Sequence, residues 1–286
     1  MSVNQKQIIA VNDISCIGRC SLTVALPVLS AAGIHTALLP TSLLSTHTGG
    51  FTGFTFLDLT EEMKRVLAHW ETLSLSFDAV YSGYLGSADQ VEIVEQVMRD
   101  YPGYLFVDPV MGDCGRYYTG FSDPFAKKML SLCRKAHGIV PNVTEACMML
   151  GEPYREPPFE QDYIDSILQK LAGETKADIV MTGVSFDKES VGCACLDRKS
   201  GKTDFIMRKT VEGYYHGTGD VFASSLLAAL LNDIPLKDSA EIATDFTVAS
   251  LSRTHAYGDD TRYGVAFEQE ISSLLSRIEP NRGKRS

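Results

Sequence analysis

The segment that decides the fold reads His216-Gly217-Thr218-Gly219-Asp220 and runs on into Val221-Phe222-Ala223-Ser224-Ser225-Leu226-Leu227-Ala228-Ala229-Leu230-Leu231. A glycine-bearing turn thus leads into an apolar stretch, which predicts a helix over Val221–Leu231. The first amides of a helix have no internal partners and carry partial positive charge, so they attract anions such as phosphate. Two interpretations of Asp220 stay open: it caps the helix, or it accepts a proton from an attacking hydroxyl group.

Outward from this segment, β-like apolar runs alternate with helical patterns. The predicted strands are Gln7–Val11, Ile34–Pro40, Ala79–Ser82, Tyr104–Asp108, Gly138–Val140 and Asp178–Thr182, then a hairpin of Val191–Leu196 and Thr203–Lys209. The other predicted helices are Leu22–Ala32, Glu61–Trp70, Ala88–Asp100, Pro124–Lys135, Val143–Leu150, Asp162–Ala172, Leu236–Arg253 and Val265–Ile278. The alternation predicts an α/β fold, with a central, mostly parallel sheet covered by helices on both faces.

Bulk properties limit the function classes. The chain has 286 residues and a formal net charge of -10, which argues against nucleic acid and anionic membranes as partners. No apolar run approaches transmembrane length and the N-terminus lacks a signal-peptide core, so we expect a cytoplasmic protein. Seven cysteines without a C-x-x-C pair are expected to be reduced thiols. We expect one domain over residues 1–279 and a disordered tail at 280–286.

Polar and glycine-rich residues follow the predicted strands and should meet at one edge of the sheet, where such folds bind ligands. They are Asn12-Asp13, Ser82-Gly83-Tyr84, Asp108 to Asp113, Pro141-Asn142 and Thr182-Gly183. The loops G-x-x-x-x-G-K-[ST] and G-x-G-x-x-G are absent, so a phosphoryl donor needs another cradle. The segment Gly217–Asp220 is the candidate.

Carboxylates gather at this predicted edge. Asn142-Val143-Thr144-Glu145 fits a helix cap with Glu145 at the third position, but it also suits an amide and a carboxylate arranging water around Mg²⁺. Asp108 and Asp113 add negative charge nearby, and like charges repel unless a cation lies among them. Of the acceptor-side candidates, Tyr84 can cover an aromatic ligand or pack in the core. The loop Ser45–Phe51 can close over a small polar ligand or serve as a plain crossover.

In combination, these motifs resemble the ribokinase-like superfamily, and within it the pyridoxal kinases. The strings that carry the resemblance are Ser82-Gly83-Tyr84-Leu85-Gly86-Ser87, Asp108-Pro109-Val110-Met111-Gly112-Asp113, Pro141-Asn142-x-x-Glu145 and Gly217-Thr218-Gly219-Asp220. The similarity runs from about residue 7 to residue 255. It implies the three-layer ribokinase-like fold and ATP-dependent phosphorylation of the 5-hydroxymethyl group of a vitamin B6 vitamer.

The resemblance also implies roles for individual residues. Asp220 matches the catalytic base, beside an anion hole of Gly217, Thr218 and Gly219. Asp108, Asp113, Asn142 and Thr182 match positions around ATP and its phosphates, and Glu145 matches a group that handles Mg²⁺ largely through water. Asp13, Thr48 and Tyr84 match the pocket for the pyridine ring. The family further implies a homodimer, and a monovalent cation is a further candidate cofactor.

One departure and two rival functions stay open. Many pyridoxal kinases carry serine where this chain has Asp13, whose carboxylate could pair with a ring hydroxyl, a pyridinium or the amine of pyridoxamine. The preferred vitamer is therefore open. A kinase for hydroxymethylpyrimidine, the thiamine precursor, is the nearest alternative. A non-catalytic B6 or nucleotide sensor is the alternative from another class, and the presence of Asp220, Asn142 and Glu145 together argues against it. A sugar kinase is disfavoured because no inserted lid of extra strands is evident.

Overall fold

A computed structural model describes residues 5–282, and within them a nine-stranded sheet forms the centre of the molecule. The strands lie in the order β11-β10-β9-β8-β5-β4-β1-β2-β3, and a small hairpin of β6 and β7 stands apart from this sheet. Their bounds are β1 Gln7–Ile17, β2 His35–Thr46, β3 Phe56–Asp58, β4 Ala79–Ser82, β5 Tyr104–Val107, β6 Gly112–Asp113, β7 Arg116–Tyr117, β8 Gly138–Ile139, β9 Asp178–Val184, β10 Ser190–Leu196 and β11 Thr203–Lys209. The six strands from β9 to β2 in this order pair in parallel, while β3, β10 and β11 pair antiparallel.

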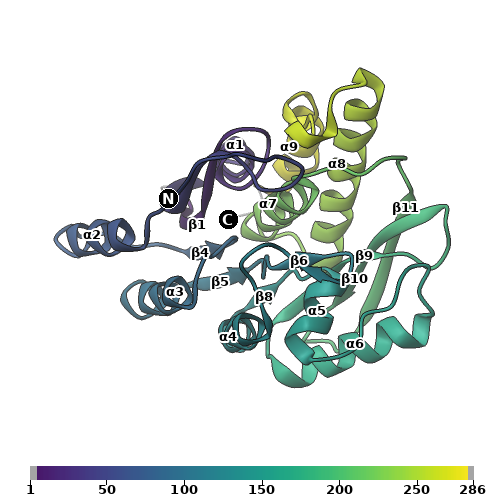
Figure 1. The fold of residues 1–286 in the computed structure, drawn as a ribbon, viewed down its shortest axis with the longest axis horizontal. Coiled ribbons are helices and arrows are strands. Elements are labelled where there is room, and N and C mark those ends of the chain that lie inside the picture. The colour runs from purple at the N-terminus through teal and green to yellow at the C-terminus, as the bar shows by residue number, and fades with distance from the viewer. Residues whose placement is uncertain (1–4, 283–286) are drawn as a thin grey trace.

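Helices cover both faces of the sheet, as Figure 1 shows. One face carries α2 (Thr60–Trp70), α3 (Ala88–Asp100), α4 (Asp123–Cys133), α5 (Val143–Leu150) and α6 (Gln161–Glu174). The other carries α1 (Leu22–Ala31), α7 (Thr218–Leu231), α8 (Leu236–Tyr257) and α9 (Ile271–Arg282). Two 3₁₀ turns, Thr261–Tyr263 and Glu268–Glu270, lie between α8 and α9. The predicted α/β fold with helices on both faces is confirmed.

Alternation along the strands divides the core into two halves. In β4, Val80 packs with the α2–α6 layer and Tyr81 with the α1, α7–α9 layer, because neighbouring strand residues point to opposite faces. Leu105 and Phe106 of β5 divide in the same way. Burial on both faces explains why these strands read as unbroken apolar runs in the sequence.

The structure corrects three expectations at the ligand edge. We expected a loop at Asn12-Asp13, but β1 continues to Ile17 through an irregularity in its pairing with β2 between Asn12 and Ile14. No extra strand was evident in the N-terminal third, yet β3 adds an antiparallel strand beside β2. The helix predicted from Val221 begins at Thr218, so Asp220 is its third residue and Gly217, not Asp220, is the N-cap. These differences shift polar residues from loops into regular elements.

The last helix begins and ends later in the chain than predicted. The helix expected over Val265–Ile278 is α9, Ile271–Arg282, so the predicted start of the tail at residue 280 falls inside this helix. Residues 283–286 of that predicted tail lie outside the described residues. Within the described range, none of the helices combines the length and hydrophobicity needed to cross a membrane.

Candidate active site

The N-terminus of α7 is an open helix end. Gly217 has a positive φ of 74°, and a Cβ built there would lie 2.0 Å from the backbone oxygen of Arg19, so only glycine fits. No side chain caps the helix, and Val221 N–H makes the first i to i−4 bond, to Gly217. A Cβ at Gly219 would meet open space. The first-turn amides are therefore available to an anion, and the predicted anion-hole residues lie together.

Asp220 lies in this first turn as a half-buried carboxylate. Burial raises its pKa to about 7, and the negative charge of Asp13 adds to that rise. The backbone amide of Ser21 and the side chain of Asn12 oppose it, since both favour the charged carboxylate. A carboxyl group with a pKa near neutrality is suited to take a proton from a hydroxyl at physiological pH.

Asp13 lies beside Asp220 on the irregular part of β1. Its carboxylate accepts hydrogen bonds from the hydroxyl of Ser15, at 3.1 Å, and from that of Ser21. Burial raises the pKa of Asp13, which is only 5% exposed. The bond to Ser21 holds a residue with a positive φ of 55°, the same residue whose backbone amide favours the charged form of Asp220. The Asp13 carboxylate is therefore hydrogen-bonded within the protein and also lies near Asp220.

The N-terminus of α5 is closed by its own side chains. Asn142 Oδ1 accepts from Glu145 N–H at 2.8 Å, and Glu145 Oε2 accepts from Asn142 N–H at 2.9 Å, which completes the predicted capping box. Glu145 Oε1 accepts from Met111 N–H at 3.1 Å. Asn142 Nδ2 donates to Gly112 O at 2.9 Å. Both carboxylate oxygens of Glu145 are thus engaged by backbone amides.

Asp108 differs from Glu145 in its bonding. It is 7% exposed, and its carboxylate makes no hydrogen bond to any residue between 5 and 282. Burial raises the pKa of Asp108, and the charges of Glu145 and Asp220 raise it further. Burial also raises the pKa of Glu145. A cation among these carboxylates would relieve the repulsion, and Mg²⁺ prefers such oxygen ligands.

The described residues contain no group of three or more His, Cys, Asp or Glu side chains arranged to hold a metal ion. A magnesium ion here would therefore need water or substrate phosphates to complete its coordination. The buried, unpartnered carboxylate of Asp108 fits such an ion. Glu145, with both oxygens engaged, fits contact through water.

Two further predicted nucleotide-side residues flank this group. Asp113, in β6, accepts from Cys114 N–H at 2.8 Å and from the hydroxyl of Tyr214 at 3.2 Å, which ties the β6–β7 hairpin to the segment before α7. Thr182, in β9, bridges to Asn142 in parallel fashion. Both residues thus lie at the edge of the sheet where α5 and α7 begin.

Two of the residues predicted to line the pyridine-ring pocket, Tyr84 and Thr48, differ in their surroundings. Tyr84 donates its backbone N–H to Asn12 Oδ1 at 2.8 Å, and its ring packs edge-on against Phe121 at 5.6 Å. Burial raises the pKa of Tyr84 to about 12. Thr48 is exposed in the loop after β2 and makes no hydrogen bond to the residues described. The structure therefore joins Tyr84 to the site directly, but not Thr48.

The loop that holds Thr48 is itself anchored beside α7. His47 Nε2 lies 2.5 Å from Arg262 O, and its ring centroid is 5.0 Å from that of His216. Phe51 packs against Tyr263 at 5.3 Å. The predicted alternatives for Ser45–Phe51, a loop that closes over a ligand or a plain crossover, did not include this anchoring, because the contacts join segments more than 150 positions apart.

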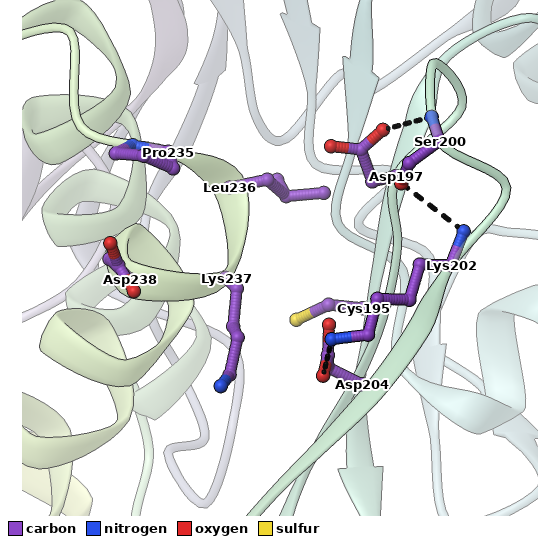
Figure 2. Close-up of a pocket in the computed structure, with 9 residues that line it drawn as sticks. All are labelled: Cys195, Asp197, Ser200, Lys202, Asp204, Pro235, Leu236, Lys237 and Asp238. Carbon is purple, nitrogen blue, oxygen red and sulfur yellow. Dashed lines mark hydrogen bonds and ion pairs between the residues drawn. The ribbon is translucent and has the colours of Figure 1, made fainter.

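The cavity drawn in Figure 2 lies away from this site. It measures about 280 Å³ and opens between the β10–β11 turn and the start of α8. Since β10 runs antiparallel to β9, this turn lies near the amino end of β9, whereas Thr182 lies near its carboxyl end. Its lysines are paired, Lys202 with Asp204 at 2.9 Å and Lys237 with Glu241 at 3.8 Å. The cavity thus offers no unpaired cation to an anionic ligand.

The chain is similar over most of its length to known kinases. The model of the phosphomethylpyrimidine kinase family matches residues 25–264. A Bacteroides thetaiotaomicron protein, provisionally named a phosphomethylpyrimidine kinase and crystallised with pyridoxal, is 36% identical, with a TM-score of 0.90 over 95% of this chain and 96% of that one. Pyridoxal kinase from Lactobacillus plantarum is 34% identical, with a TM-score of 0.88 over 96% and 98%. The pyridoxine/pyridoxal/pyridoxamine kinase of Bordetella avium is 27% identical over 252 residues, 83% of this chain and 81% of the relative.

Proposed function

This chain belongs to the pyridoxal kinase family of the ribokinase-like superfamily, and from that premise we propose that it phosphorylates the 5-hydroxymethyl group of a vitamin B6 vitamer with ATP. The observation that carries the proposal is the uncapped N-terminus of α7 with the Asp220 carboxyl in its first turn. It combines an anion-binding end with a base of nearly neutral pKa. The products are the vitamer 5'-phosphate and ADP.

In the proposed reaction, Asp220 accepts the proton of the acceptor hydroxyl as its oxygen attacks the γ-phosphorus. The new O–P bond forms while the bond to the ADP oxygen breaks, and the proton remains on Asp220. The amides of Thr218 and Gly219 donate to the transferring phosphoryl group, whose negative charge they stabilise. The protein thus contributes position and electrostatics, with no covalent intermediate.

Mg²⁺ would be held by Asp108 directly and by Glu145 through water. When bound, the ion would neutralise phosphate charge. Asn142 and Thr182 pair through a parallel β-bridge, and both are proposed to border the phosphates of ATP. Asp113 is proposed to border these phosphates from the β6–β7 hairpin. The local cation and the open helix end explain how a chain with net charge -10 could use an anionic cosubstrate.

On the acceptor side, Tyr84 and Asp13 are proposed to contact the pyridine ring, with Thr48 on the loop that covers it. Tyr84 is supported by its half-buried ring beside Phe121. Asp13 keeps part of its acceptor capacity after bonding to Ser15 and Ser21, since a carboxylate offers about four lone-pair sites. A cationic partner, such as a protonated ring nitrogen or an amine, would suit this charge.

We also propose that two copies of the chain associate through the arm formed by β3 and the adjoining parts of β1 and β2. This arm exposes the apolar side chains Ile17, Leu43, Phe56 and Leu57, and Leu43 and Leu57 lie opposite each other across the strands. An apolar arm at the open edge of a sheet is a surface that a partner commonly covers. Analytical ultracentrifugation of the wild type should show a dimer, and Leu57→Lys should shift it toward monomer; a monomeric wild type would contradict this.

An acceptor panel tests the proposed function. ADP release should be measured with ATP and Mg²⁺ for pyridoxal, pyridoxamine, pyridoxine and hydroxymethylpyrimidine at equal concentrations. We expect at least one B6 vitamer to exceed hydroxymethylpyrimidine about tenfold or more in kcat/KM. Higher kcat/KM for hydroxymethylpyrimidine would favour the alternative that the family model's name suggests. A ligand-dependent thermal shift with no ADP release from any acceptor would instead indicate a sensor.

A further inference from the structure

Asn12 is a buried amide for which the proposed reaction has no role yet. It lies in β1 just before Asp13 and is 1% exposed. Its Oδ1 accepts two backbone hydrogen bonds, from Tyr84 N–H at 2.8 Å and from Asp13 N–H at 3.0 Å. These two donors fix which end of the amide is oxygen, because Nδ2 in that place could not accept them.

The Nδ2 group therefore points away from these amides. It forms no hydrogen bond with any residue in the described part of the chain, an arrangement that is costly for a buried donor. A Cβ at Gly83 would lie 2.3 Å from Nδ2, so Gly83 leaves the space that the amide fills. The Asn12 side chain is also near enough to Asp220 to favour the charged form of that carboxyl.

Several acidic groups around Asp220 interact with it electrostatically, and a charged neighbour disfavours its carboxylate form. Asp13 of β1 raises the pKa of Asp220 by its charge. Asp108, after β5, is also coupled electrostatically to Asp220, as are the thiol of Cys20 and the hydroxyl of Tyr81 in β4. Among the described residues, two donor groups oppose this rise and favour the charged carboxylate: the Ser21 backbone amide and the nearby Asn12 side chain. Of the two, only Asn12 can be altered by substituting a side chain.

We propose that Asn12 is a positioning residue for Asp220, donating from Nδ2 to one carboxylate oxygen so that the other faces the acceptor hydroxyl. The inference rests on the proposed function, in which Asp220 is the base. Hydrogen bonds of this kind are often long in an enzyme without substrate and shorten when the complex forms. The unused Nδ2 donor is then explained by a bond that closes during the reaction.

Asn12→Asp tests this directly, since it keeps the side-chain shape. One oxygen still accepts from Tyr84 and Asp13, but the donor is replaced by a negative charge facing Asp220. We expect the acid limb of kcat to move up by one pH unit or more, with a ten- to hundredfold lower plateau and KM for ATP within about twofold. Gly83→Ala displaces the amide without adding charge and should lower kcat in the same way with a smaller shift of the limb.

Asn232→Asp is the matched control. Asn232 is a buried amide at the far end of α7 that donates to Ala32 O and Ala228 O, so its replacement also buries a carboxylate. It should lower the melting temperature and leave the acid limb of kcat unmoved. If folded Asn12→Asp and Gly83→Ala both keep the wild-type limb and plateau, the role of Asn12 is overturned. Asp220→Asn is measured alongside: retained turnover there would instead overturn Asp220 as base, and with it the proposed mechanism.

Discussion

Two helices, α5 and α7, begin at the same edge of the sheet. Side chains cap the first turn of α5, whereas the first turn of α7 has no side-chain cap. At α5, Asn142 and Glu145 satisfy each other's backbone amides, and Glu145 also binds Met111. At α7, Gly217 is the cap, and no side chain among residues 5–282 makes a capping hydrogen bond there. A capped end contributes to stability, whereas an uncapped end gives up that stability and stays available to a ligand. The contrast supports the proposal that the N-terminus of α7 meets the phosphoryl group, while that of α5 is closed by its own side chains.

The largest effect is expected at Asp220. Asp220→Asn removes the base but keeps the shape, and kcat for a B6 vitamer should fall by about 10²–10⁴-fold. Asp238→Asn is the matched control, since Asp238 is likewise the third residue of its helix, α8, but is exposed at the far edge of the sheet. Its kcat should stay within about twofold of wild type. Equal losses in the two variants would mean that any first-turn carboxylate matters, and would break the contrast.

Gly217→Ala should produce the largest loss of stability. The added Cβ meets the Arg19 backbone oxygen at 2.0 Å on a residue of positive φ, and we expect a loss of about 2–4 kcal/mol in the free energy of unfolding. Gly151 also has a positive φ, 67°, with nothing within 4 Å of an added Cβ. Gly151→Ala should therefore cost only about 1 kcal/mol. Urea unfolding of both variants measures the difference; similar losses would show that the close approach of α7 to Arg19 is unimportant.

Asp220→Asn should also change stability, with a sign that depends on pH. The folded pKa, about 7, lies above the ordinary value of 3.8, so the folded state binds the proton more tightly. Wild-type stability from this group is therefore present below pH 4 and is lost as pH rises to 7. At pH 8 the Asn variant should be more stable by about 1–3 kcal/mol, a range reduced because Asp220 is partly exposed. Urea unfolding at pH 4 and pH 8 checks this; a variant less stable at pH 8 would contradict it.

The smallest effect concerns the closed helix end. Asn142→Ala removes the cap of α5 and should lower the free energy of unfolding by about 1 kcal/mol. Ser87→Ala at α3 removes a similar cap, where the Ser87 hydroxyl accepts from Gln90 N–H at 3.3 Å, and should cost about as much. Only Asn142→Ala should also raise KM for ATP with Mg²⁺. An unchanged KM would reduce Asn142 to a cap alone.

Elements whose ends are marked by a local sequence pattern have the predicted bounds. The strand Ala79–Ser82 and the helices Ala88–Asp100 and Val143–Leu150 match their predicted bounds, because apolar period and caps mark both ends. The edge at which the polar residues gather followed from parallel topology. Asp220 as the helix cap was wrong, since Gly217 can take a positive φ at the cap, and the helix starts earlier as a result.

What the sequence could not supply were contacts between distant segments. The irregularity at Asp13 depends on pairing with β2, and the orientation of Asn12 depends on the Tyr84 amide, 72 positions away. A polar dipeptide next to an apolar strand was the available signal for Asn12, but it reads equally well as a loop. The anchoring of the loop after β2 by Arg262 and His216 gives no local signal at all.

The pH dependence of kcat for the wild-type enzyme with a B6 vitamer, ATP and saturating Mg²⁺ tests the central claim most directly. If the carboxyl in the open first turn of α7 is the base, kcat should fall about tenfold per pH unit below an apparent pKa near 7 and level off above it. A profile that stays flat from pH 5.5 to 8.5 would contradict Asp220 as the proton acceptor.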